Sequence, residues 1–355
     1  MKKIILLSFS ILSFSCSAQD REDTNIMAGA IDVLHYDIQL RVDDSDSMIY
    51  GTTEIQFQAL TDLSQARFNL KGLTLTESRL DGEMILCQYA GEIISVAPKV
   101  GFKKGSIHKI SFTYSGKPKD GLIIKINKYK HFSAFSDNWA NRARYWFPCI
   151  DHPSDKATVS FRVDVPLSYQ VVANGKLVKE EVNEKPSGET PGGHQLKTYQ
   201  FEMNVPTPTY CMVIGICKFA ITATLTEDQI PLYYYSFPED SVHAVNAFRR
   251  VPDMIKFFES TIGPYPFAKL ALVQSSTIYG GMENSSAIFF PEEGAPYNGK
   301  GMNEATVAHE ISHQWFGDDL TEKNWPELWL SEGFATYFSA LYFESREAKN
   351  VWMNL

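Results

Sequence analysis

The sequence lacks the features of several large classes of protein. No segment reaches eighteen uninterrupted apolar residues, so we expect no membrane-spanning helix. No run of lysine and arginine could supply the basic face that nucleic-acid binding needs, and the formal net charge is −9. No internal repeat is visible. With 44% hydrophobic and 21% charged residues over 355 positions, the chain has globular composition and enough length for two domains with a core.

Cysteine is also scarce, with five residues. Cys211 and Cys217 lie in Tyr210-Cys-Met-Val-Ile-Gly-Ile-Cys217, which we interpret as one strand. Six residues of strand span roughly 20 Å, so these two thiols cannot bridge each other. The other pairings stay open, and we expect buried free thiols.

The first eighteen residues are typical of a secretory signal peptide. Lys2 and Lys3 precede the apolar stretch 4–14, and Cys16-Ser-Ala18 offers small residues for cleavage. We therefore expect an exported protein, in the periplasm or cell envelope. Two alternatives are a lipoprotein anchored through Cys16, although Ser13 stands where such signals usually have leucine, and a buried N-terminal strand.

We place a first domain at 22–228, and from residue 31 to about 228 it shows repeated period-two alternation of apolar residues. Strict alternation indicates strands with one buried and one exposed face, and Gly, Asn, Asp and Pro clusters separate them. We expect an antiparallel β domain, with an exposed loop at 183–194. The three clearest alternating sets are Tyr36/Ile38/Leu40/Val42, Val159/Phe161/Val163/Val165 and Tyr199/Phe201/Met203/Val205.

The pattern becomes helical after about residue 240, so we place a second domain at 229–355. Apolar residues recur every three or four positions from Val242 to Phe258, and Pro252 predicts a kink or two shorter helices. We expect a strand at 269–274, then helices over 303–316 and 326–343.

The segment His309-Glu-Ile-Ser-His313 indicates a metal site. Residues four apart share one face of a helix, so both imidazoles can bind one ion. Glu310 projects at a neighbouring angle and can reach a metal-bound water as general base, the arrangement of a zinc peptidase. The alternative is a helix that happens to hold two histidines, but apolar Val307 and Ile311 predict burial, and buried histidines need partners.

Glu332 is the candidate third ligand. Catalytic zinc usually takes three protein ligands, and Glu332 follows His313 by nineteen positions in the next predicted helix. A solvated helix carboxylate is the alternative, although Trp329, Leu330 and Phe334 argue against simple exposure.

These motifs resemble the aminopeptidase N family of zinc metallopeptidases, within the gluzincins and related to leukotriene hydrolase. The zinc motif, Trp329-Leu-Ser-Glu-Gly-Phe-Ala335, Gly280-Gly-Met-Glu-Asn284 and Ala143-Arg-Tyr-Trp-Phe-Pro-Cys-Ile-Asp151 carry the similarity. The resemblance implies an α+β fold: an antiparallel β N-terminal domain followed by a partial thermolysin-like catalytic domain. It also implies one zinc ion per chain and peptide substrates with a free N-terminus.

The segment Gly280, Gly281, Met282, Glu283 and Asn284 is the candidate substrate site. Two glycines let a backbone approach a ligand closely, and an extended peptide could pair with the edge of the preceding strand. By itself the segment is also a plausible glycine-rich turn. The resemblance implies that Glu283 binds the substrate α-amino group, which makes the enzyme an exopeptidase.

The sequence departs from the family pattern in two places. Relatives usually have Gln or Glu at the position of Trp139, so the grip on the substrate amine would be weaker or would use Asp137. The chain also stops 23 residues after Glu332, and the tyrosine that stabilises the tetrahedral intermediate in relatives lies further on. Tyr337 and Tyr342 are rotated away from the metal side at about 100° per residue. We therefore expect a truncated, weakly active chain.

The sequence thus predicts a zinc aminopeptidase that removes N-terminal residues through metal-activated water, with Glu310 as base. Three alternatives stay open. An endopeptidase would share the zinc site but has no use for the Gly-Gly-Met-Glu-Asn segment. A leukotriene-type epoxide hydrolase also carries Gly-Gly before Met. A non-catalytic binding protein would keep a vestigial metal site.

Overall fold

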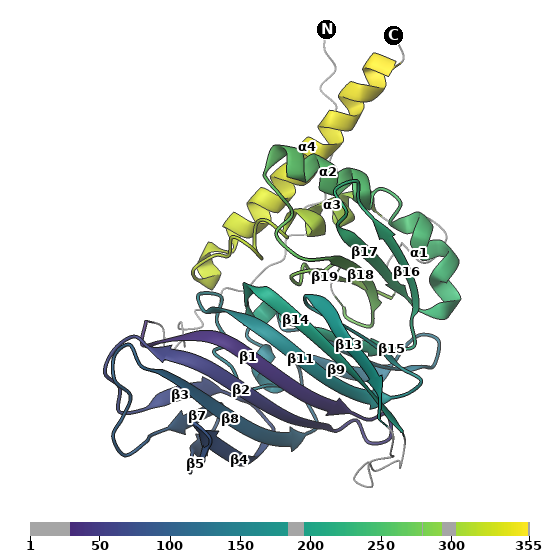
Figure 1. Cartoon of the computed structure of the whole chain (residues 1–355). Coiled ribbons are helices and arrows are strands. Elements are labelled where there is room, and N and C mark those ends of the chain that lie inside the picture. The colour runs from purple at the N-terminus through teal and green to yellow at the C-terminus, as the bar shows by residue number, and fades with distance from the viewer. Residues whose placement is uncertain (1–28, 184–194, 279, 293–302, 354–355) are drawn as a thin grey trace.

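The computed structural model describes residues 29–183, 195–278, 280–292 and 303–353. The predicted signal peptide, including Cys16, and all but the first residue of the predicted loop 183–194 lie outside this part of the chain. A large twisted sheet forms one half of the molecule, and helices packed on a smaller sheet form the other (Figure 1). No helix within the described ranges combines the length and the apolar character that crossing a membrane requires.

The first half is built from strands. Its largest sheet has the order β13-β14-β11-β1-β2-β8-β4-β5, and two further sheets have the orders β12-β15-β10-β9 and β3-β7-β6. The strands are β1 (Ile31–Val42), β2 (Ile49–Ala59), β3 (Ala66–Asn69), β4 (Thr74–Leu80), β5 (Glu83–Met84), β6 (Gln88–Ala90), β7 (Ile93–Val96), β8 (Ile107–Gly116), β9 (Leu122–Ile126), β10 (Phe132–Ser136), β11 (Lys156–Pro166), β12 (Gln170–Ala173), β13 (Lys176–Val182), β14 (Leu196–Pro208) and β15 (Ile214–Cys217).

The predicted alternation is confirmed in the long strands. β2 alternates buried and half-buried residues along its whole length, and β11 does so nearly throughout. Tyr36, Ile38 and Leu40 on β1 face the core beside the alternating apolar residues of β11. The alternating side chains therefore form one apolar face, as period two requires.

The prediction of an antiparallel domain needs one correction, because β1 and β11 pair in parallel. The neighbouring pairs β1–β2 and β11–β14 are antiparallel. Alternation of side chains is the same in both kinds of ladder, so the sequence pattern could not reveal the direction of this pair.

The single strand predicted for 210–217 is also wrong in its first half. Residues Thr209–Cys211 form a 3₁₀ turn, and only Ile214–Cys217 are in strand β15. Buried amide side chains replace strand partners here: Asn138 Nδ2 donates to Met212 O at 2.6 Å, and Asn174 Oδ1 accepts from Val213 N. Free thiols are confirmed for the cysteines within the described residues, Cys87, Cys149, Cys211 and Cys217, of which Cys87 is half-buried.

The second half contains a mixed sheet and helices. The sheet has the order β16-β17-β18-β19, formed by β16 (Ala220–Leu225), β17 (Pro231–Ser236), β18 (Leu270–Ser275) and β19 (Ala287–Pro291). The boundary predicted near residue 228 falls in the turn between β16 and β17, two neighbours in this sheet. The proposed division of the chain stays a prediction.

The helices follow the predicted order. They are α1 (Ser241–Ala247), α2 (Val251–Thr261), α3 (Glu304–Ser312) and α4 (Trp329–Met353). Pro252 separates two helices rather than kinking one, since it lies in the first turn of α2, where its missing N–H costs nothing. Pro326 lies in a short 3₁₀ turn before α4 rather than in the helix itself.

Several contacts join the two halves. Lys156, which begins β11, donates to the carbonyls of Asp318 and Asp319 at 3.0 and 2.7 Å. Within the first half, the Arg144 guanidinium forms a buried ion pair with Asp151, so this part of the 143–151 motif has a structural role.

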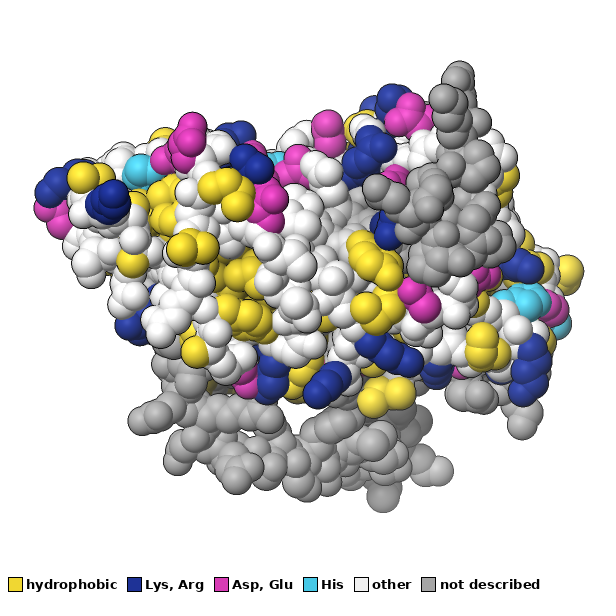
Figure 2. Space-filling model, turned by 90° about the horizontal axis from the view of Figure 1, so that it is seen from below, with side chains coloured by type: hydrophobic (Ala, Val, Ile, Leu, Met, Phe, Trp, Pro, Cys, Tyr) yellow, Lys and Arg dark blue, Asp and Glu magenta, His cyan; other side chains and the backbone are white. Residues whose placement is uncertain are grey.

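Figure 2 shows side chains of both charge signs interspersed over one face, with hydrophobic side chains between them.

Candidate metal centre

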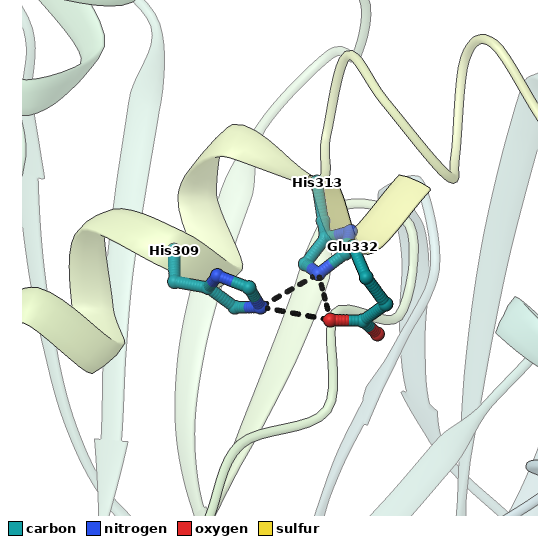
Figure 3. A group of neighbouring side chains, drawn as sticks. All are labelled: His309, His313 and Glu332. Carbon is teal, nitrogen blue, oxygen red and sulfur yellow. Dashed lines mark hydrogen bonds and ion pairs between the residues drawn. The ribbon is translucent and has the colours of Figure 1, made fainter. Parts of the chain in front are cut away.

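Three side chains from two helices converge on one point, as Figure 3 shows. His309 Nε2 lies 3.0 Å from His313 Nε2 and 3.3 Å from Glu332 Oε2. The third separation, from His313 Nε2 to Glu332 Oε2, is 3.8 Å. Tetrahedral zinc with bonds near 2.0–2.1 Å would hold its ligand atoms about 3.3 Å apart, so the three atoms fit one face of such a site.

The protonation pattern of the histidines also fits a metal. His313 Nδ1 lies 2.9 Å from the Phe316 carbonyl, which can only accept, so Nδ1 carries the proton. In the neutral ring Nε2 then carries a lone pair on the side of the His309 ring, and a metal-bound histidine usually donates its other ring N–H to an acceptor in this way. Partial desolvation opposes it, but the adjacent His309 and His313 rings hold the pKa of Glu332 well below its usual range, which favours the ionised carboxylate that a metal binds.

The ligand helices have local reasons for their positions. Asn303 caps α3 by accepting from Ala305 N at 3.1 Å, and Val307 and Ile311 bury the opposite face. Ser331, next to Glu332, donates to the buried carboxylate of Glu322 at 2.6 Å. The start of α3 and the first turn of α4 are therefore fixed by side-chain hydrogen bonds as well as by packing.

Glu310, the predicted base, is buried against the glycine-rich segment. A Cβ placed on Gly281 would lie 2.3 Å from Glu310 Oε1, so the bare backbone makes room for the carboxylate. Burial raises the pKa of Glu310 to about 8; His313 opposes the rise, and Glu283 and Glu332 add to it. A divalent cation at the three ligands would favour the ionised form.

The Gly280–Asn284 segment lies at the edge of the small sheet, but not as predicted. Strand β18 is interior, and the edge strand is β19. Met282 pairs with Phe289 of β19 through two hydrogen bonds of 2.9 and 3.0 Å. The segment thus forms the outer rim of the sheet itself, and a peptide would meet its backbone rather than that of β18.

The members of this segment differ in exposure. Glu283 is buried, and burial raises the pKa of its carboxyl group. The nearby charge of the candidate ligand His313 opposes this rise. A Cβ on Gly280 would meet no described atom within 4 Å, so that side of the backbone is open. Asn284 is fully buried, with Nδ2 3.4 Å from Met282 O, and thus braces the turn. Its predicted substrate contact stays a prediction.

The position of Trp139 has an aromatic environment. Its ring packs edge-on against Trp325, with centroids 6.2 Å apart, and Trp325 in turn contacts Tyr210. Asp137, considered as a replacement for the missing acidic residue, is buried in an ion pair with Arg142. Burial raises the pKa of Asp137 to about 6, and Arg142 opposes the rise. We therefore do not assign Asp137 to the substrate amine.

The two tyrosines of α4 lie away from the candidate metal ligands, as the helix geometry predicts. Tyr342 is buried against Phe257 and Phe258 of α2, with centroids 5.6 and 6.3 Å away. Tyr337 is exposed and packs on Phe338. Neither position offers its hydroxyl to the metal ligands.

One residue with a clear role in the site was missed. Gln314, directly after His313, donates to the Glu283 carbonyl at 2.6 Å. A glutamine on the buried side of a helix end is common, and only the fold reveals that this one faces the candidate substrate segment. The sequence offered one indication of this role, namely that Gln314 directly follows the candidate ligand His313.

Comparison with known proteins agrees with this geometry. The model described as "Peptidase M1 N-terminal domain" matches residues 33–211, and "Peptidase family M1 domain" matches residues 246–355. The chain belongs to peptidase family M1. The resemblance noted from the motifs is confirmed, as is the order of a mostly β domain before the catalytic domain.

Individual M1 relatives cover most of this chain. Tricorn protease-interacting factor F2 of Thermoplasma acidophilum is 30% identical over 304 residues, which is 81% of this chain and 37% of the relative. Glutamyl aminopeptidase of Sus scrofa is 25% identical, over 94% of this chain and 38% of its own length. The crystal structure of an M1 zinc metallopeptidase from Deinococcus radiodurans has a TM-score of 0.73 and 25% identity, covering 90% of this chain and 71% of that one. The chain spans less than two fifths of these two curated relatives.

Proposed function

We propose that this chain carries the active site of a zinc-dependent aminopeptidase that hydrolyses the N-terminal peptide bond of peptides. One observation supports it most strongly: the ligand atoms of His309, His313 and Glu332 lie within 4.8 Å of one another, and Glu310, which follows His309, packs its buried carboxyl group against Gly281 of the glycine-rich segment. Curated relatives named glutamyl and leucyl aminopeptidase support the same chemistry.

His309, His313 and Glu332 would hold the zinc ion. Two neutral imidazoles and one carboxylate are a donor set that zinc prefers in hydrolases, and three protein ligands leave one position open. When bound, zinc polarises the scissile carbonyl and lowers the pKa of water.

Glu310 is the proposed general base. Its carboxylate takes a proton from the attacking water and delivers it to the leaving amine. The carboxylate packs against the backbone of Gly281, so it lies next to the candidate substrate segment. This placement lets one group serve both proton transfers without moving far.

Glu283 is the proposed anchor for the substrate ammonium. A buried carboxylate close to the candidate metal ligands attracts a cation strongly, so an ammonium bound there would make the first residue of the peptide the one next to the metal. The fixed anchor distinguishes an exopeptidase from an endopeptidase, which would need an open groove on both sides of the cleaved bond. No specific contact favours the epoxide hydrolase or the non-catalytic alternative.

The test is digestion of a peptide and its N-acetylated twin by the zinc-loaded chain, followed by mass spectrometry. We expect stepwise loss of single N-terminal residues from the free peptide and almost none from the acetylated one. Internal cleavage of both peptides would identify an endopeptidase. Binding of the free peptide without any cleavage would support the non-catalytic alternative.

We also propose export through the segment 1–18, followed by cleavage after Ala18. The order of Lys2 and Lys3, an apolar stretch and small residues supports this proposal. N-terminal sequencing of the mature protein tests it: a start at Gln19 is the expected result. A lipid-modified N-terminus at Cys16 would favour the lipoprotein, and retention of Met1 would contradict export.

A further inference from the structure

Gln314 uses its whole side-chain amide to join the metal-ligand helix to the substrate segment. Its Nε2 donates to the Glu283 carbonyl at 2.6 Å and to Asp318 Oδ2 at 2.7 Å. Its Oε1 accepts from Ser286 N at 2.8 Å and from the Tyr265 hydroxyl at 3.1 Å. The side chain is fully buried, and two donor and two acceptor contacts use its hydrogen-bonding capacity.

The orientation of this amide is fixed by its partners. Ser286 N can only donate, so it must face the oxygen, and the Glu283 carbonyl can only accept, so it must face the nitrogen. The opposite orientation would place two donors and two acceptors against each other in a buried site. Gln314 therefore holds both ends of the turn 283–286.

The connection between the two functional groups is short. Gln314 follows the ligand His313 by one peptide bond, and one hydrogen bond leads from its amide to the backbone of Glu283. The far side of the turn is held from both halves of the molecule: Lys269, just before β18, donates to Ser286 O at 2.7 Å, and Asn174, just after β12, donates to Ser285 O at 2.7 Å. Against that fixed support, Gln314 sets how far Glu283 lies from the metal ligands.

From this geometry we propose that Gln314 is a positioning residue that sets the distance between the amine anchor Glu283 and the metal centre, and so determines that exactly one residue of substrate fits between them. The inference rests on the proposed function. An aminopeptidase must bind the ammonium and the scissile carbonyl at a separation of one residue, and a misplacement of about 1 Å can cost up to a hundred-fold. The distance would be lost without loss of metal, because the ligand atoms belong to other residues.

The test measures binding rather than turnover. A zinc-loaded chain carrying Glu310→Gln, which blocks hydrolysis, is titrated calorimetrically with a tripeptide of free N-terminus and with its acetylated twin. We expect this Glu310→Gln chain, the parent in this test, to bind the free tripeptide about ten- to a hundred-fold more tightly than the acetylated one. Adding Gln314→Met should reduce the preference to about three-fold or less, with zinc content equal to that of the parent.

Two further variants make the result decisive. Tyr265→Phe removes a hydroxyl from the same Oε1 but leaves the hydrogen bond to Glu283, so it should keep the full preference. Gln314→Glu keeps the oxygen that accepts from Ser286 and removes the amide donor, so it should lose the preference even where the methionine variant does not fold.

The outcomes separate this inference from the proposed function. Gln314 variants that keep zinc and keep the preference would overturn the positioning role alone. Loss of zinc in both Gln314 variants would show that the residue supports the whole helix, which also overturns it. A parent without any preference for the free tripeptide would overturn the amine anchor of the proposed function, and the inference with it.

Discussion

The Glu310 carboxylate packs against the bare α-carbon of Gly281, where an added Cβ would lie 2.3 Å from Oε1. A branched side chain at 281 would displace the carboxylate of the proposed base. A displacement of about 1 Å lowers the rate about ten- to a hundred-fold. We therefore expect Gly281→Val to lower kcat by about that factor while zinc content is unchanged. Steady-state kinetics with an aminoacyl-anilide and metal analysis check this.

The matched control for this change is Gly333→Ala on α4. A Cβ at Gly333 meets no described atom within 4 Å, so the methyl group displaces nothing. Alanine should also stabilise the helix by about 0.5–1 kcal/mol. Equal kcat in the Gly281→Val variant and the parent would show that the contact with Glu310 does not position the base.

Replacing the anchor carboxylate should change selectivity rather than metal binding. Glu283→Gln removes the charge at nearly constant shape, so a charge-assisted contact to the ammonium worth about 1.5–3 kcal/mol is lost. We expect kcat/KM for free-N-terminus substrates to fall about ten- to a hundred-fold. The low activity on acetylated substrates should not change, because they lack the ammonium.

The control for the anchor is Glu292→Gln, another buried carboxylate just after β19. Glu292 accepts from Lys128 N at 2.8 Å and lies outside the cluster of ligands. It should leave the ratio of free to acetylated rates unchanged. If both glutamine variants changed that ratio equally, Glu283 would have no special place at the substrate amine.

Zinc should stabilise the folded chain through its three ligands. A metal that binds the native state alone raises the melting temperature with its concentration. We expect this rise in the parent and in His243→Ala, whose exposed side chain lies on α1. The alanine variants of His309, His313 and Glu332 should lose the response in calorimetric scans. A zinc-dependent shift that survives in His313→Ala would place the metal elsewhere.

Lys269 predicts a pH dependence of stability. It is buried, and within the described part of the chain its Nζ donates to the carbonyls of Ala173 and Ser286 at 2.9 and 2.7 Å. Burial lowers its pKa from 10.5 to about 7. Between these values the unfolded chain binds one more proton than the folded chain, so this group's contribution to stability rises with pH and levels off below about 7.

Comparison with Lys269→Met isolates this contribution. Between pH 7.5 and 9.5 the unfolding free energy of the parent should rise relative to the variant by about 1.4 kcal/mol per pH unit. Denaturant unfolding at several pH values measures the difference. A constant difference across this window would mean that Lys269 stays protonated in the folded chain.

Much of the fold follows from local patterns. Strands such as β11 were visible because alternation is a property of one segment, and a helix beginning near 303 was visible from its own residues. Pairing direction was not visible, since β1 and β11 are joined only by tertiary structure. The strand predicted at Cys211 failed because Asn138 and Asn174 satisfy that backbone from distant positions.

The candidate site divides in the same way. The candidate ligands His309 and His313 could be proposed from the sequence because helix geometry fixes their spacing. The role of Gln314 could not, because its partners Glu283 and Ser286 come from another element. Trp139 could be placed by aligning its segment with the family motif, which showed that the usual Gln or Glu is absent. Its contact with Trp325 became visible only in the fold.

The central claim is that Glu310 is the base of a zinc hydrolase, and one paired measurement tests it. Zinc content and aminoacyl-anilide hydrolysis are determined side by side for the parent and Glu310→Gln at equal protein concentration. We expect one zinc per chain in both, and a rate lower by about a hundred- to ten-thousand-fold in the variant, the usual effect of removing a general base. A Glu310→Gln protein that holds zinc and turns over substrate as fast as the parent would contradict the account.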